Sequence, residues 1–253
     1  MATTTPPPGG TSAEPIELST GETVSLPLVT EATVYGAVFS ASYAGVSELL
    51  PEGLVPVRAT PRRAAVTVLS VEYHRVGDDA VEPYDEVSVQ FPAVPAGERA
   101  WPYASVFTHG VTEGYVWYLP VTGESATALG VDFWGYPKVV GDITHDDHVA
   151  GRRTTLAVDG EGVLTLDVGK PPTLDLSLEG ASYTVKDGQL LRERLTLDGR
   201  MGLWPHTERV SLELGTHERA QRLRALDLGS RALARSYLDG EFVIGPGQRV
   251  ELA

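Results

Sequence analysis

Phe133-Trp134-Gly135-Tyr136-Pro137-Lys138-Val139-Val140-Gly141 is a stretch that places one lysine among apolar and aromatic residues. Lysine is scarce in this chain: of 20 Lys plus Arg, only Lys138, Lys170 and Lys186 are lysines. Where arginine serves for ordinary charge, a lysine in such surroundings indicates amine chemistry, because the two side chains are not interchangeable. Lys138 is therefore the first candidate for a functional residue.

The apolar neighbours of Lys138 suit a nucleophilic amine. A free lysine has a pKa of about 10.4 and is a cation at neutral pH, whereas desolvation disfavours the cation and lowers the pKa. The neutral amine can form an imine with a ketone, and the imine accepts electrons when carbon dioxide leaves or when an aldol, retro-aldol or dehydration step follows. Spacing alone leaves open that Lys138 is a strand-edge residue that reaches past its neighbours to solvent.

Composition predicts an ordinary globular protein. The chain has 253 residues, of which 42% are hydrophobic, and this suits a sizeable core. We expect residues 1–17 to form a disordered tail without the pattern of a secretory signal, and residues 18–253 to form one domain. No apolar run approaches the roughly 18 residues of a membrane-spanning helix, and cytoplasm is the expected location. The absence of cysteine excludes disulfides and thiolate metal sites.

The charge balance excludes polyanionic partners. The formal net charge is −14 and the sequence pI is about 4.8. Nucleic acid and anionic membrane surfaces would be repelled, so neither is an expected partner.

Strand patterns dominate the chain. Runs rich in β-branched and aromatic residues predict strands, and Asp159–Gly162 predicts a hairpin turn between two of them. The strand runs are Thr33–Phe39, Ala64–Tyr73, Val87–Phe91, Gly114–Leu119, Thr154–Val158, Val163–Val168, Glu208–Leu214 and Glu241–Ile244. Short helices are expected over Tyr43–Leu50, Glu124–Leu129 and Thr216–Leu228. The pattern predicts a single, mostly antiparallel β domain with a few peripheral helices.

Four segments resemble the acetoacetate decarboxylase family. Ala128–Gly141 resembles its active-site segment, in which a Tyr-Pro-Lys tripeptide carries a Schiff-base lysine, here Lys138. Glu82–Glu86 is similar to the segment that supplies the family's catalytic glutamate, which matches Glu86. Leu49–Leu54 resembles an early helix end, and Ser211–His217 a late strand-to-helix turn. The resemblance covers roughly residues 25–250.

The resemblance implies a β-barrel or cone-like antiparallel sheet, a homo-oligomer, and a lyase that needs no cofactor. Such an enzyme would decarboxylate a small β-keto acid such as acetoacetate, with Lys138 forming the imine and Glu86 handling protons. The expected substrate-binding residues are Tyr84, Trp134, Tyr73 and Gln90. Without the resemblance, a turn carboxylate, a half-buried sheet tyrosine and core packing are the structural alternatives for these residues.

Three departures from the family pattern alter the expected substrate. Val139 replaces the second lysine that many family decarboxylases carry, and the strand matching Glu31–Phe39 lacks the arginine that suits a substrate carboxylate. The second acidic residue falls near Thr67, with Glu72 a few positions away. Two alternatives follow: an aldolase-dehydratase that acts on pyruvate-type oxo acids and aldehydes through the same lysine, and a non-catalytic member that binds a small molecule.

His145-Asp146-Asp147-His148 contains residue types that bind metals. Adjacent side chains on a strand point to opposite faces, so we expect a solvated acidic loop here instead of a metal site. His109, His206 and His217 show no ligand spacing, and there is no phosphate-binding glycine loop or dinucleotide fingerprint. We therefore expect neither a metal nor a cofactor.

Overall fold

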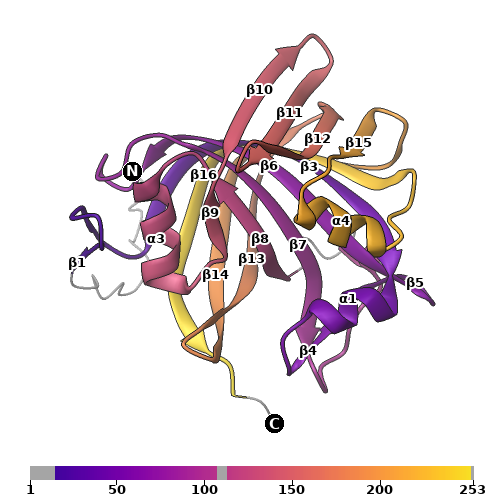
Figure 1. The fold of residues 1–253 in the computed structure, drawn as a ribbon, viewed down its shortest axis with the longest axis horizontal. Coiled ribbons are helices and arrows are strands. Elements are labelled where there is room, and N and C mark those ends of the chain that lie inside the picture. The colour runs from indigo at the N-terminus through magenta and orange to yellow at the C-terminus, as the bar shows by residue number, and fades with distance from the viewer. Residues whose placement is uncertain (1–14, 107–112, 252–253) are drawn as a thin grey trace, which may run out of the picture.

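A closed β-barrel forms the centre of the molecule (Figure 1). The computed structural model describes residues 15–106 and 113–251, and within these ranges seven strands pair in the order β7-β6-β3-β16-β14-β13-β8. The barrel closes where β8 pairs with β7, and all neighbours are antiparallel except β13 and β8. The barrel strands are β3 (Leu28–Ser42), β6 (Arg63–Val76), β7 (Asp85–Pro95), β8 (Gly114–Val121), β13 (Leu174–Lys186), β14 (Gln189–Thr207) and β16 (Ala232–Arg249). The predicted fold class, mostly β with a barrel and minor helices, is confirmed.

A second sheet covers part of the outside of the barrel. Its strands pair in the order β10-β11-β12-β15, which are Asp142–His148, Gly151–Val158, Glu161–Gly169 and Val210–Leu214. Val87, Val89 and Phe91 of β7 pack in one core with Leu156 and Leu164 of this sheet. Because side chains alternate along a strand, the residues between them on β7 face the inside of the barrel.

Helix α3 (Glu124–Trp134) covers one end of the barrel. It contacts β9 (Lys138–Val140), β13 and β16, and Figure 1 shows it on the side opposite to α1 (Tyr43–Leu49) and α4 (Glu218–Ala225). The helix ends at Gly135, whose φ of 67° lies in the left-handed region that glycine tolerates best. A Cβ there would lie 2.7 Å from the Cβ of Lys186. The turn at Gly135 directs the chain from α3 into Tyr136-Pro137-Lys138.

The remaining elements are short. They are β1 (Ile16–Glu17), β2 (Thr23–Val24), β4 (Leu54–Pro56), β5 (Arg58–Thr60) and the 3-10 helix η1 (Tyr103–Ser105). Several boundaries differ from expectation, and the helix expected to end at Leu129 runs to Trp134. Ile16–Glu17 pair with β2, so the predicted tail is too long at its end, and its residues 1–14 lie outside the described residues. The late helix begins after His217, whose side chain accepts from the Arg219 N–H and replaces Thr216 as the cap.

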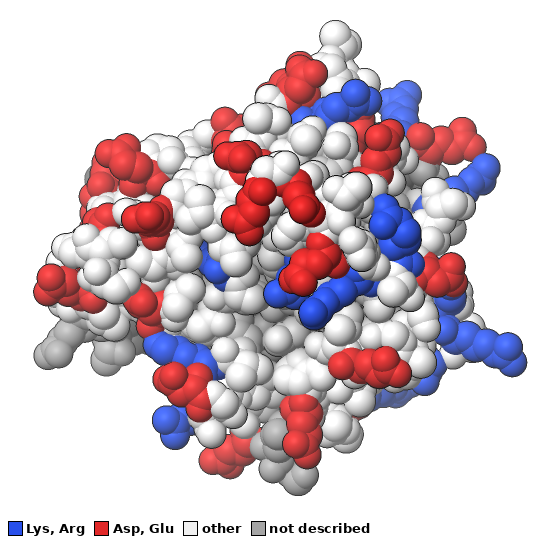
Figure 2. All heavy atoms as spheres, viewed as in Figure 1, with Lys and Arg blue, Asp and Glu red and all other residues white. Residues whose placement is uncertain are grey.

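Acidic side chains are spread over the face shown in Figure 2, in keeping with the net charge of −14. Within residues 15–106 and 113–251, no helix is long and apolar enough to cross a membrane.

Candidate active site

Lys138 is held inside the protein against a carboxylate and a phenol. It begins β9, which pairs in parallel with β8 so that Lys138 lies beside Leu119. Its Nζ atom lies 3.1 Å from Oε2 of Glu86 and donates to the hydroxyl of Tyr84 at 3.2 Å. The Lys138 and Glu86 side chains are only 4% and 8% exposed. Lys138 therefore does not reach solvent past its neighbours, and the strand-edge alternative is wrong.

The surroundings of Lys138 lower the pKa of its amine. Burial lowers the pKa of Lys138, while the charge of Glu86 and its hydrogen bond act in the opposite direction without cancelling the shift. Burial also raises the pKa of Tyr84 well above its usual value, so that its hydroxyl keeps its proton. The pair thus combines an amine that is easily deprotonated with a phenol able to donate a hydrogen bond.

Glycine at position 130 makes room for the lysine chain. A Cβ at Gly130 would lie 2.5 Å from Cε of Lys138 and 2.6 Å from Cδ. A glycine inside a helix costs about 1 kcal/mol relative to alanine. Here the missing side chain lets Lys138 pass directly across the surface of α3 toward Glu86.

Lys138 and Glu86 open into a cavity of about 730 Å³ inside the barrel. Tyr84, Tyr73, Trp134 and Gln90, the residues expected to bind substrate, all line this cavity. The rings of Tyr73 and Tyr84 lie 4.6 Å apart, while the Trp134 indole N–H is already used by the Gly245 carbonyl at 3.0 Å. The structure thus brings all six predicted site residues to one cavity.

The family's second acidic residue is expected near Thr67, with Glu72 a few positions away, and the structure places these two residues differently. Thr67 lines the cavity, but Glu72 does not, because it lies on the opposite face of β6. Glu72 instead pairs with Arg152 outside the barrel at 2.7 Å. Among the described residues that line the cavity, Lys138 is the only cation and Glu86 the only carboxylate.

A second buried carboxylate, Glu193 of β14, lies behind the cavity wall and was not foreseen from the sequence. Ser182 and Thr184 donate to its two oxygens at 2.9 and 3.1 Å, and Ser182 also contacts the Tyr136 hydroxyl at 2.9 Å. Burial raises the pKa of Glu193 to about 7, although both hydrogen bonds oppose this rise. Arginines flank Glu193 in the sequence, and this pattern is typical of a solvated strand face, so it gave no signal of burial.

The expectation of a loop at His145–His148 is wrong, because these residues belong to strand β10, but Asp146, Asp147 and His148 are solvent-exposed as expected. His145 is largely buried between the barrel and the second sheet, with its ring nitrogens 3.0 Å from Thr154 Oγ1 and 3.4 Å from Asp85. Asp147 binds the buried Arg152. Pairing with β11 along its whole length fixes the segment as a strand. Within the described part of the chain, no three His, Asp or Glu side chains gather in a way that could hold a metal.

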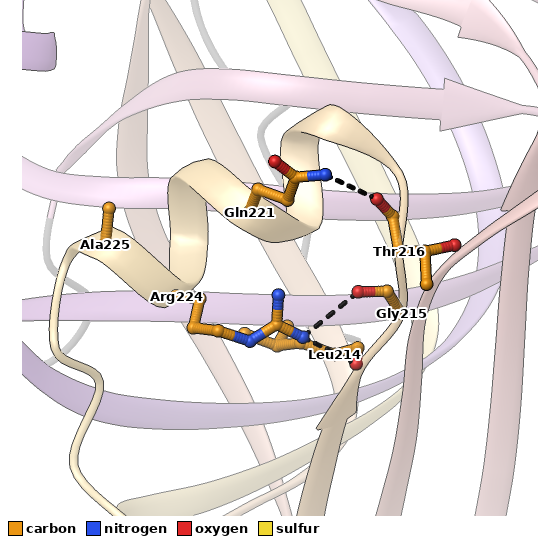
Figure 3. A pocket seen from close by; sticks show the side chains of 6 residues that line it. All are labelled: Leu214, Gly215, Thr216, Gln221, Arg224 and Ala225. Atoms are coloured by element: carbon orange, nitrogen blue, oxygen red, sulfur yellow. Dashed lines mark hydrogen bonds between the residues drawn. The ribbon is translucent and has the colours of Figure 1, made fainter.

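A second hollow lies at the surface beside α4 (Figure 3). Its polar side chains already form hydrogen bonds with the backbone. Arg224 donates to the carbonyls of Leu214 and Gly215, and Gln221 donates to that of Thr216. These contacts fasten α4 to the end of β15 and the turn that follows it. The hollow offers no titratable group comparable to the pair in the barrel.

A family model described as acetoacetate decarboxylase matches residues 13–251. The chain belongs to the acetoacetate decarboxylase family. The resemblance seen in the four short segments is therefore confirmed. A search of curated proteins found no match.

Several solved structures share the fold at low identity. The acetoacetate decarboxylase of Legionella pneumophila has a TM-score of 0.64 and 15% identity, and the match covers 89% of this chain and 87% of that one. The enduracididine biosynthesis enzyme MppR, solved with pyruvate, has a TM-score of 0.63 and 15% identity over 89% and 91% of the two chains. An acetoacetate decarboxylase-like enzyme from Sphingomonas wittichii RW1 has a TM-score of 0.58 and 19% identity over 88% and 92%.

Proposed function

We propose that this protein is a Schiff-base-forming lyase that decarboxylates a β-keto acid through an imine on Lys138. The observation that carries the proposal is the buried amine of Lys138, in contact with Glu86 and Tyr84 at one end of a ligand-sized cavity. Family membership supports the same chemistry. A single perturbed amine in a cavity is the arrangement expected of a lysine nucleophile.

The reaction begins with the neutral amine of Lys138. Nζ attacks the ketone carbon, and water leaves as the C=N bond forms. Protonation of the imine nitrogen then prepares it to accept the electron pair of the bond to the carboxylate. When that bond breaks, carbon dioxide leaves and an enamine remains. Protonation of the enamine carbon and hydrolysis of the resulting imine release the ketone and restore Lys138.

Glu86 and Tyr84 supply the proton steps. Glu86 lies 3.1 Å from Nζ, close enough to take a proton from the attacking amine and to return one to the enamine. Tyr84 keeps its proton and can donate a hydrogen bond to the ketone oxygen as negative charge develops there. The apolar walls place the substrate carboxylate in surroundings less favourable than water, which favours its loss as neutral carbon dioxide.

An aldolase-dehydratase is the second candidate. It is supported by the fold shared with MppR, which was solved with pyruvate. In this reaction the pyruvate imine would lose a methyl proton to give an enamine. The enamine carbon would attack an aldehyde, water would be lost from the adduct, and hydrolysis of the imine would release an unsaturated oxo acid and restore Lys138.

Product analysis separates the candidates. Release of carbon dioxide from β-keto acids, above a matched rate without enzyme, supports the decarboxylase. Enone absorbance from pyruvate and an aldehyde, without carbon dioxide release, would favour the aldolase-dehydratase. Tight binding of oxo acids with neither product would show a non-catalytic binding protein and overturn the proposal.

A further inference from the structure

The cavity differs strongly between its two ends. One end contains Lys138 and Glu86 and lies under α3, with Trp134 and Tyr136 in its wall. From this end, apolar side chains of β13, β14 and β16 continue along the cavity: Leu195 packs in the same core cluster as Trp134, and Leu203 in another cluster. The residues of this leucine wall are Leu178, Leu195, Leu197, Met201, Leu203 and Phe242.

The length of the cavity exceeds what a four-carbon acid needs. Glu86 and Pro92 both line it and lie six residues apart on β7, which corresponds to roughly 20 Å along the strand. With the usual tilt of barrel strands this is about 15 Å along the axis. A volume of about 730 Å³ also falls within the range of sites for drug-sized ligands, typically about 300–1,000 Å³. Acetoacetate would occupy only the Lys138 end.

Core packing explains only part of the leucine wall: Leu195, Phe242 and Leu203 pack against core clusters, whereas among the described residues Leu178 and Leu197 belong to none. Along β14, Leu195 and Leu197 face the cavity and keep solvent-accessible surface, while their neighbours Arg194, Thr196 and Asp198 are exposed on the outer face. Leu178 of β13 is likewise half-buried between the exposed residues Ser177 and Glu179. An apolar ligand that covers such side chains removes apolar surface from water, and this favours binding.

Polar side chains of several strands line the cavity, among them Thr67 of β6, Ser182 of β13 and Ser236 of β16, and the longest polar run lies on β7. Glu86, Ser88 and Gln90 alternate along β7, and Gln90 donates to Ser88 at 3.0 Å, so these two side chains already satisfy each other in part. A ligand that places its ketone at Lys138 therefore has an apolar path along the leucine wall.

We propose that the substrate is an oxo acid whose ketone carries an extended apolar substituent, with the ketone carbon at Lys138 and the substituent along the leucine wall. This inference rests on the proposed function. The substituent is attached to the ketone carbon on the side opposite to the carboxylate, so it remains in place while carbon dioxide is lost. Its burial would orient the substrate without a cation for the carboxylate.

Two series of ligands test the inference. Binding of butanoate, hexanoate, octanoate and decanoate, measured by calorimetry, requires no imine. We expect Kd to fall about fourfold for each added methylene until the chain fills the cavity. In turnover of 3-oxo acids of the same lengths, kcat/KM should rise in parallel. A Kd and a kcat/KM that are independent of length would overturn the inference, even if every 3-oxo acid releases carbon dioxide. Length-dependent binding without turnover would support the apolar site and count against the proposed function.

A matched pair of variants tests where the apolar substituent of the substrate lies. Leu178→Trp fills part of the leucine wall, whereas Ser177→Trp adds the same side chain on the outer face of the same strand. The ratio of kcat/KM for 3-oxodecanoate to that for acetoacetate should fall at least about tenfold in Leu178→Trp and stay near the wild-type value in Ser177→Trp. Circular dichroism and a thermal melt show whether each variant is folded. Equal ratios in two folded variants would contradict the proposed path.

Discussion

Lys138 and Arg152 are both buried cations, but their surroundings lead to opposite outcomes. Lys138 has one carboxylate partner, the buried Glu86, whose Oε2 atom lies 3.1 Å from Nζ. Arg152 has two, Asp147 at 2.6 Å and Glu72 at 2.7 Å, and both carboxylates reach solvent. Burial lowers the pKa of both cations, yet the two hydrogen-bonded carboxylates more than offset this at Arg152, and its net pKa is raised.

The difference shows how this fold separates reactivity from stability. A cation with two solvated partners stays charged and holds the second sheet to the barrel, since Asp147 belongs to β10 and Glu72 to β6. A cation with one buried partner is poised to lose its proton. Four substitutions test this contrast.

Replacing Lys138 should have the largest effect. Lys138→Met keeps an apolar chain of similar length but removes the amine, so turnover should fall by a factor on the order of 10⁴ or more. The substitution also leaves the buried Glu86 without its cation, so we expect the free energy of unfolding to fall by about 3 kcal/mol, and the loss of turnover is measured under conditions where the variant is folded. Steady-state kinetics and urea unfolding measure the two quantities. Lys170→Met is the control for loss of a lysine, and turnover near wild type in Lys138→Met would refute the mechanism.

Gly130→Ala should disturb the position of the amine without changing its chemistry. The added Cβ would lie 2.5 Å from Cε of Lys138, so the lysine chain must shift. A displacement of about 1 Å at a reacting group can cost about 10²-fold in rate. We expect kcat to fall by about that factor in a folded protein. Gly162→Ala is the matched control, since a Cβ there meets nothing within 4 Å. Unchanged kcat in Gly130→Ala would mean that the close approach to Lys138 has no functional role.

Removing Arg152 should affect stability instead of activity. Arg152→Met leaves Asp147 and Glu72 without their shared cation, and we expect the free energy of unfolding to drop by about 2 kcal/mol. This lies below the cost of breaking a fully buried pair because both carboxylates reach water. Arg153→Met removes an exposed arginine paired with Asp167, and a change below about 1 kcal/mol is expected. Comparable losses of stability in both variants, measured by urea unfolding, would contradict the assigned role of Arg152.

The pH dependence of imine formation should respond to Glu86. Imine formation requires the neutral amine, so its rate rises with pH through the pKa of Lys138, which burial holds below its ordinary value. The charge of Glu86 raises this pKa, and Glu86→Gln should therefore move the rise to lower pH. Glu193→Gln is the control, because Glu193 is not among the groups that shift the pKa of Lys138. Trapping rates measured across pH give both profiles. If the rise in the rate moved to higher pH in Glu86→Gln, Glu86 would not be the group that raises the pKa of Lys138.

The short segments near Lys138 could be recognised from sequence because their function is local. Tyr-Pro-Lys and the segment ending at Glu86 each carry their own pattern, and the barrel brings them within hydrogen-bond distance. The barrel strands β13 and β14 were not predicted, although leucines alternate with polar residues over Leu174–Glu179, a pattern typical of a strand with one solvated face. What this pattern does not indicate is that the leucine face borders a cavity. Glu193 was missed because the arginines on either side of it are typical of a solvated face.

The error at His145–His148 has a different cause. Polar composition favours a turn, but β10 gains backbone pairing with β11, and Arg152 and Thr154 bind its side chains. Tertiary contacts therefore override local preference. A homo-oligomer, which the family resemblance implied, remains a prediction.

Trapping the imine is the most direct test of whether Lys138 is the nucleophile. The protein is incubated with acetoacetate, pyruvate or a longer 3-oxo acid, reduced with borohydride, and analysed by intact mass and peptide mapping. With three lysines in the chain, each candidate amine can be assigned. We expect one reduced adduct, located on Lys138. An unchanged mass with oxo acids that bind, or an adduct on Lys170 or Lys186 alone, would contradict it.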